Sequence, residues 1–146
     1  GIEHKTFNIR DGLGIKLWQQ AGFQVGIVTG RSSHVVQWRS NELGVNFVRQ
    51  GIRDKVKAVS EIIALCHLDW DSLAYIGDDL PDLSVIQRAG FGVAVADACQ
   101  EVQKASDFTT QLPGGKGAVR ETIEVLLRSR GCWENLVQNY QGNGIA

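Results

Sequence analysis

Short apolar runs alternate along this chain with longer amphipathic segments. Three of the runs are nearly unbroken and are typical of strands buried on both faces of a parallel sheet. These runs are Gln24–Val28, Leu73–Ile76 and Gly92–Ala96, and two weaker candidates are Phe47–Val48 and Phe108–Thr109.

In the segments between these runs, apolar residues recur at the spacing of one helix face. Polar residues that favour helix starts, and glycines that favour helix ends, mark several boundaries. Asp11 is the expected cap of the first helix, and Pro81 suits a first helical turn. Helices are therefore expected over Asp11–Ala21, Ser33–Leu43, Asp54–Cys66, Pro81–Ala89 and Ala118–Leu127, with one or two more amphipathic turns after Gly131.

Strands that alternate with helices predict βαβ units. The expected fold is α/β, a doubly wound parallel sheet with helices on both faces. Neither an internal repeat nor a linker divides the sequence. We therefore expect one domain over residues 1–131 and a C-terminal tail over residues 132–146.

Composition limits the possible partners. Fifteen Lys and Arg against sixteen Asp and Glu give a formal net charge of -1, so no overall field attracts nucleic acid or an anionic membrane. An apolar run of about eighteen residues, the length that spans a bilayer, is not found. The three cysteines form no CxxC pair, which predicts free thiols in a reducing cytoplasm. The histidines match no zinc spacing.

Three carboxylates follow the second predicted strand within five residues: Asp78, Asp79 and Asp82. Ligands of open parallel sheets bind beyond the carboxyl ends of the strands. Like charges packed this densely need a compensating cation or proton. Hard oxygen ligands at a helix start suit Mg²⁺, which needs only one or two protein carboxylates. Alternatively, these aspartates simply cap the helix that begins near Pro81.

The segment Thr29-Gly30-Arg31-Ser32-Ser33 follows the first predicted strand. A hydroxyl group and backbone N–H groups at a helix N-terminus form a phosphate cradle. Arg31 adds a permanently charged, planar donor for phosphate or carboxylate. The alternative is an ordinary serine-capped helix.

Three further segments are candidates for the same site. Lys55 opens a helix, where the dipole favours anions, so a bound phosphate or the carboxylate cluster would explain it; a solvated lysine is the alternative. Arg10 precedes the first helix and either lies over a ligand or belongs to a plain cap. The glycine-rich loop at residues 113–117 does not have the P-loop spacing and is otherwise a flexible turn.

The order of these motifs resembles the haloacid dehalogenase superfamily, and within it the family of 3-deoxy-D-manno-octulosonate 8-phosphate phosphatases. The resemblance covers residues 3–128. It is carried by residues 7–15, Gln50-Gly51, the Tyr75–Asp82 segment, residues 93–98 and the Gly114–Glu121 segment.

The resemblance implies a role for each matching residue. Thr29 is expected to hydrogen-bond the transferring phosphoryl group, and Lys55 to neutralise phosphate and nucleophile. Asp78 is expected to ligate Mg²⁺, with Asp79 or Asp82 holding metal-bound water or orienting Lys55. Gly30, Arg31 and Arg10 are the expected substrate-binding residues. Relatives that act on a nine-carbon sugar acid tend to carry glutamate at the position of Arg31, so arginine favours the eight-carbon substrate.

The resemblance also implies a homotetramer, no large cap domain, a small sugar-acid phosphate as substrate and a role in lipopolysaccharide precursor synthesis. In the family, an Asp-x-Asp strand supplies the nucleophile, which forms an aspartyl-phosphate that water then hydrolyses. No such motif occurs here in that context, so the first, central strand is missing, and Gln24–Val28 and Leu73–Ile76 are not expected to pair directly. The alternatives are a nine-carbon sugar-acid phosphatase, a catalytically silent assembly domain and a phosphate-binding receiver.

Overall fold

The computed structural model describes residues 7–142, in which helices flank parallel strands. The strands are β1 (Gly26–Val28), β2 (Phe47–Arg49), β3 (Ala74–Gly77), β4 (Phe91–Ala94) and β5 (Phe108–Thr109). The α-helices are α1 (Ile9–Gln20), α2 (His34–Leu43), α3 (Lys55–Leu65), α4 (Leu83–Arg88), α5 (Gln100–Ala105), α6 (Ala118–Ser129) and α7 (Trp133–Gln138), and the 3₁₀ turns are η1 (Trp70–Ser72) and η2 (Leu80–Asp82).

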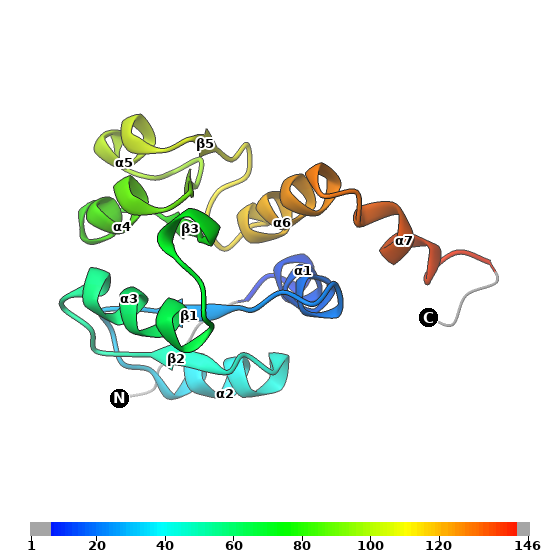
Figure 1. The fold of residues 1–146 in the computed structure, drawn as a ribbon, viewed down its shortest axis with the longest axis horizontal. Coiled ribbons are helices and arrows are strands. Elements are labelled where there is room, and N and C mark those ends of the chain that lie inside the picture. The colour runs from blue at the N-terminus through cyan, green and yellow to red at the C-terminus, as the bar shows by residue number, and fades with distance from the viewer. Residues whose placement is uncertain (1–6, 143–146) are drawn as a thin grey trace.

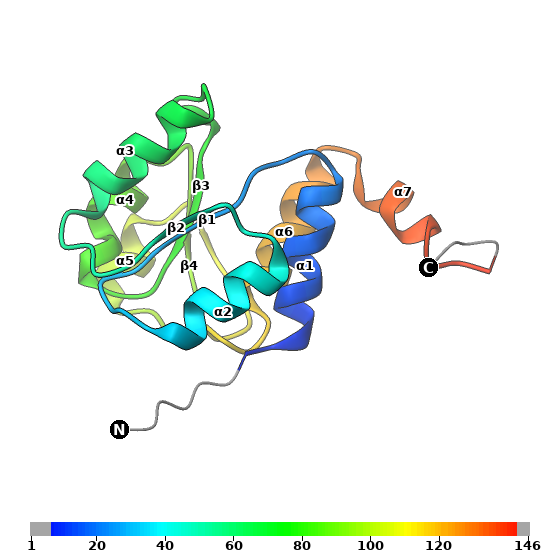
Figure 2. The same ribbon diagram turned by 90° about the horizontal axis from the view of Figure 1, so that it is seen from below.

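The strands form two parallel sheets, β1-β2 and β3-β4-β5. Figure 2 shows α3, α4 and α5 on one side of the strands and α1 with α6 on the other. The doubly wound α/β class predicted from the sequence is therefore confirmed. Within residues 7–142, β1 and β3 each have one edge without a strand partner, and the expectation that these two strands do not pair directly is also confirmed.

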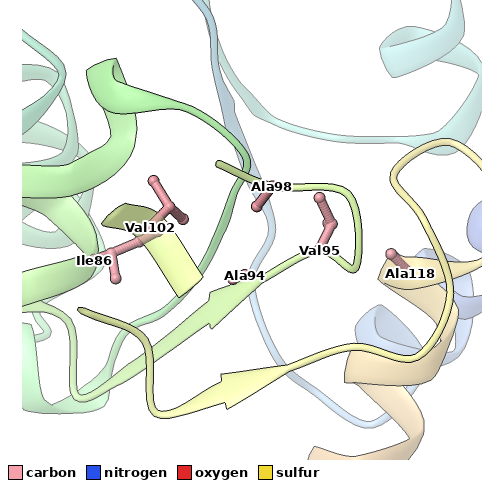
Figure 3. Packing of buried hydrophobic residues seen from close by; sticks show 6 residues of the cluster. All are labelled: Ile86, Ala94, Val95, Ala98, Val102 and Ala118. Carbon is pink, nitrogen blue, oxygen red and sulfur yellow. The ribbon is translucent and has the colours of Figure 1, made fainter. Parts of the chain in front are cut away.

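Three apolar clusters hold the layers together. One lies around Val95 and Val102 and joins β4, α5 and the start of α6 (Figure 3). A second, around Leu17 and Leu127, packs α1 on α6 and takes in Trp133 and Leu136 of α7. Helix α7, the amphipathic turn expected after Gly131, therefore contributes buried side chains although it extends beyond α6 (Figure 1).

The expected starts of the first helix and the first strand are wrong. In each case a side chain forms a hydrogen bond with a nearby backbone group. The first helix begins at Ile9 and not at Asp11, since the side chain of Asn8 accepts a hydrogen bond from the Asp11 amide at 3.1 Å and serves as the cap. The first strand begins at Gly26, because the indole N–H of Trp18 donates to the carbonyl of Gln24 at 2.8 Å.

Two further boundaries near Pro81 and Gln100 differ from expectation. The helix expected over Pro81–Ala89 is split into η2 and α4 at Asp82, which ends the 3₁₀ turn and precedes the first residue of α4. Helix α5 was not expected. It is six residues long, and its sequence contributes a single buried residue, Val102, so it carries too little apolar periodicity to be read from the sequence.

Candidate functional site

The carboxyl ends of the strands bring the predicted site residues to the start of their helices. Thr29 follows β1, Lys55 is the first residue of α3 after β2, and Asp78 follows β3. A direct contact joins the two sheets at this edge, because Lys55 Nζ donates to Asp82 Oδ1 at 2.8 Å. Val28, Val56 and Tyr75, from β1, α3 and β3, pack against the third apolar cluster.

Asp82 is the most enclosed group of the site, with 4% of its surface exposed. Its Oδ1 accepts from the Tyr75 hydroxyl at 2.7 Å and from Lys55. Its Oδ2 accepts from the amides of Asp78 at 2.9 Å and Asp79 at 3.3 Å. A carboxylate offers about four lone-pair positions, so these four donors occupy the whole group.

These contacts set opposite pKa directions for the two acids bonded to each other. Burial disfavours the charge of Asp82, but hydrogen bonds from Lys55, the Asp78 amide and Tyr75 outweigh it and hold the pKa of Asp82 below its ordinary value. Burial first, and then the hydrogen bond to Asp82, raise the pKa of Tyr75 above its usual range. Tyr75 therefore stays protonated and acts as a donor.

The expected alternative, in which the aspartates cap a helix, holds for two of the three. Asp79 and Asp82 form a capping box at η2, and the Asp79 carboxylate accepts from the Leu80 amide at 2.8 Å. Asp78 stands outside that box and is exposed. Gly77 is required here, because a Cβ at this position would lie 2.5 Å from the Cβ of Asp82.

The same contacts test whether the residues fit a metal ion. Among residues 7–142 no three acidic, histidine or cysteine side chains form a group that could hold a metal, and the Asp82 carboxylate is bonded to Lys55 and Tyr75. The exposed carboxylates of Asp78 and Asp79 remain. Partial burial and the negative charges of Asp82 and Asp79 raise the pKa of Asp78, against the opposing effect of Lys55. A cation would relieve this cost, and Mg²⁺ needs only one or two carboxylates beside water, so the residues fit such an ion.

The loop after β1 is held by backbone bonds to the loop after β2. Thr29 N–H donates to the carbonyl of Arg49, and the Thr29 carbonyl accepts from Ile52, both at 3.0 Å. Gly51 N–H donates to the carbonyl of Arg31 at 3.0 Å. The Thr29 hydroxyl oxygen accepts from the Arg31 amide at 3.2 Å, which leaves its proton free to donate. Gly30 and the Arg31 side chain are exposed.

The serine-capped helix weighed as an alternative also exists, but it uses other residues. Ser33 caps α2 by accepting from the Val36 amide at 3.3 Å, and Ser33 N–H donates to the side chain of Gln50 at 2.7 Å. Thr29, Gly30 and Arg31 precede this cap and take no part in it. They remain free to contact a ligand.

Arg10 and Asp11 separate in role. Arg10 is exposed near the start of α1. The Asp11 carboxylate accepts from the amides of Gly117 at 3.3 Å and Arg120 at 2.9 Å, so it caps α6 and not its own helix. The glycine-rich loop at residues 113–117 therefore ends at a helix start that a protein carboxylate already occupies.

Asp69-Trp70-Asp71, which has the spacing of the family's nucleophile motif, lies before β3, at the opposite end of the strand from Asp78. Asp69 caps η1 through the Ser72 amide. These two aspartates are therefore excluded from the site.

No helix within residues 7–142 combines the length and the apolar character that crossing a membrane demands.

The sequence assigned no role to Tyr75. Residues two apart share one face of a strand, so Tyr75 lies on the same face of β3 as Gly77, where the missing Cβ makes room for Asp82. An aromatic hydroxyl on the same strand face as that glycine was the available signal.

Comparison with known proteins gives concordant matches. Residues 38–120 match the family described as haloacid dehalogenase-like hydrolase. The chain is 39% identical over 131 residues to 3-deoxy-D-manno-octulosonate 8-phosphate phosphatase from Escherichia coli K12, covering 90% of this chain and 70% of the relative. The enzyme of that name from Yersinia pestis is 40% identical over 127 residues, covering 87% and 68%.

Solved structures agree with these sequence matches. The 3-deoxy-D-manno-octulosonate 8-phosphate phosphatase from Moraxella catarrhalis, in complex with magnesium ion, phosphate ion and KDO, superposes with a TM-score of 0.94 at 39% identity and covers 97% of this chain and 81% of that one. The cobalt-bound deoxy-D-mannose-octulosonate 8-phosphate phosphatase from Haemophilus influenzae has a TM-score of 0.87 at 37% identity, covering 90% and 77%.

Proposed function

Because the chain belongs to the haloacid dehalogenase-like hydrolases, we propose that it is a magnesium-dependent phosphatase that converts 3-deoxy-D-manno-octulosonate 8-phosphate to KDO and phosphate. The observation that carries the proposal is the largely enclosed Lys55–Asp82 pair at the strand ends. It fixes a cation at the edge where the exposed Asp78 and the Thr29 loop also lie. The relative that holds magnesium, phosphate and KDO supports the choice of substrate.

Each residue has a part in binding and orienting the phosphoryl group. Lys55 is held by Asp82 through one N–H, so two N–H groups of its ammonium remain to neutralise phosphoryl oxygens. The Thr29 hydroxyl donates to the same group, and the exposed backbone at Gly30 adds amide donors. Asp78 and Asp79 would hold magnesium, which when bound neutralises charge on the phosphoryl oxygens. Attack on phosphorus belongs to an aspartate of the family's Asp-x-Asp motif, which these 146 residues do not contain in that context.

Arg31 and Arg10 complete the proposed site as substrate-binding residues. Arg31 is exposed beside Thr29 and carries a guanidinium that pairs with carboxylates in a planar, two-bond geometry. An eight-carbon sugar acid offers such a carboxylate. Lipopolysaccharide precursor synthesis is the role that follows from this substrate.

The assembly and the setting are further parts of the proposal. A homotetramer in which neighbouring subunits complete the site is consistent with the exposed edge that carries Thr29, Arg31 and Asp78. The cytoplasm is the proposed compartment, which agrees with three free cysteines, Cys66, Cys99 and Cys132.

The test is phosphate release by the protein made from its complete coding sequence. Eight- and nine-carbon sugar-acid phosphates and simple sugar phosphates should be compared, with magnesium and with excess chelator. We expect the eight-carbon substrate to give the highest kcat/KM and the chelator to abolish turnover. Faster hydrolysis of a nine-carbon substrate would transfer the assignment to that substrate, and an inactive complete protein would favour the silent assembly domain.

A further inference from the structure

A half-buried tyrosine joins the core to the site without any part in the chemistry described so far. Tyr75 packs against two of the three apolar clusters and sends its hydroxyl to Asp82 Oδ1 at 2.7 Å. The same oxygen accepts from Lys55 Nζ at 2.8 Å. One carboxylate oxygen is thus shared between a donor from β3 and a cation from α3.

This sharing determines where the ammonium of Lys55 lies. With the Tyr75 hydroxyl on one lone pair of Oδ1, Lys55 is confined to the other, and the two amide donors on Oδ2 prevent the carboxylate from turning. Lys55 and Asp82 are both largely enclosed, with 13% and 6% of their side chains exposed, so their contact is largely shielded from solvent.

We propose that Tyr75 is a positioning residue, whose hydroxyl holds Asp82 so that Lys55 presents its ammonium to the phosphoryl group. The inference rests on the proposed function for its catalytic consequence. Without the hydroxyl, Oδ1 would offer both lone pairs to Lys55, and the ammonium would settle toward Asp82 and away from the substrate. Small displacements of a catalytic group are costly, with about 1 Å of misplacement lowering rates by about 100-fold.

The chain offers a matched pair of variants, because it contains two tyrosines. Tyr75→Phe removes the hydroxyl and keeps the ring that packs in the core. Tyr140→Phe makes the same change at a residue that is 52% exposed and serves as the control. In the complete enzyme, Tyr75→Phe should lower kcat about tenfold and raise KM by a smaller factor, no more than several-fold, since positioning matters more in the transition state than in the ground state. Tyr140→Phe should change neither.

Binding of inorganic phosphate in the presence of Mg²⁺, measured by titration calorimetry, tests the route through Lys55. Tyr75→Phe should weaken phosphate binding several-fold in the wild-type background and have no further effect in a Lys55→Met background. An equal loss in both backgrounds would overturn the proposal. So would a lowered melting temperature with unchanged kcat, because that result would make Tyr75 purely structural.

The turnover measurements and the phosphate titrations together distinguish a failure of this inference from a failure of the proposed function. If the wild-type enzyme binds phosphate but hydrolyses no sugar-acid phosphate, the proposed substrate is wrong. The phosphate titrations still decide whether Tyr75 acts through Lys55.

Discussion

The site has two halves that differ in how fully the protein satisfies its own polar groups. Around Asp82, every acceptor position is filled by a donor from the chain, and the group is nearly inaccessible. Around Thr29 and Arg31, backbone hydrogen bonds hold the segment to the neighbouring loop, but Thr29 is only half-buried and Arg31 is exposed. Asp78 belongs to the open half although it lies four residues from Asp82.

The difference separates Asp82, which positions Lys55, from the groups that contact the ligand. A buried carboxylate with four donors cannot exchange partners cheaply, because each lost bond to a charged group costs about 1.5–3 kcal/mol. It therefore serves as a fixed reference for Lys55. Exposed groups on a fastened loop can meet a ligand without breaking anything first. Mutations in the open half should accordingly lower activity without lowering stability, whereas mutations in the closed half should lower both.

The largest effect is expected in the open half. Asp78→Ala in the complete enzyme should lower magnesium-dependent turnover by about 10³-fold or more, because it removes a direct ligand of the ion. The melting temperature should stay the same or rise, since a like charge leaves the cluster. Activity retained within tenfold, measured across a magnesium titration, would show that Asp78 is not the direct ligand.

Around Asp82, a mutation should lower stability as well as activity. Asp82→Asn removes a buried charge that four donors surround, and we expect a loss of about 2–4 kcal/mol in the free energy of unfolding in urea, with turnover down about 100-fold. Asp71→Asn, at an exposed aspartate, is the control and should cost under about 0.5 kcal/mol.

At acid pH, the difference in free energy of unfolding between Asp82→Asn and the wild type should become smaller. The pKa of Asp82 is lowered by folding, so its contribution is present above the ordinary value of 3.8 and is lost as the pH falls below it. A stability gap that stayed constant from neutral pH down into that range would contradict the account of Asp82 as a charged acceptor.

Within the open half, Arg31 should affect specificity more than overall activity. Arg31→Glu places an anion where the substrate carboxylate is expected, and we predict about a tenfold greater loss of kcat/KM on the eight-carbon substrate than on a nine-carbon analogue. Arg31→Gln separates loss of the cation from added repulsion. Equal losses on both substrates would mean that Arg31 contacts only groups that the two share.

The smallest effect concerns how stability depends on pH, which should have opposite signs for Asp78 and Asp82. The pKa of Asp78 is raised by folding, so its charge costs stability near neutral pH, and the cost disappears as the pH falls through the raised pKa. Asp78→Asn should raise the melting temperature by about 1–3 °C at pH 7 without magnesium and by nothing at pH 3. A gain of the same size at both pH values would remove the repulsion argument.

The fold and the places of the main residues could be predicted because they depend on local patterns. Apolar runs mark β1 and β3, and polar residues after a strand lie by topology at the same edge of a sheet. Helices α2 and α3 begin one residue after the expected first residues, Ser33 and Asp54, which cap them. These features need only the residues within a few positions of one another.

What could not be predicted depends on partners distant in the sequence. Which carboxylate of Asp78, Asp79 and Asp82 faces inward is decided by Lys55, 27 residues away in the chain. The same holds for Asp11, which looks like the cap of its own helix and instead caps α6. No periodicity encodes such a choice, because either arrangement satisfies the local sequence equally well.

The bonds from Asp11 to α6 have a consequence for how the protein is made. They link residues 106 and 109 positions apart, and α1 and α6 share one apolar cluster. At a translation rate of about 5–20 residues per second, roughly 5–20 s separate the synthesis of Asp11 from that of Arg120. Until then the apolar side of α1, including Leu17, has no α6 to cover it. Helix α1 is synthesised well before α6, its packing partner. We therefore expect chaperones to act on α1 during synthesis.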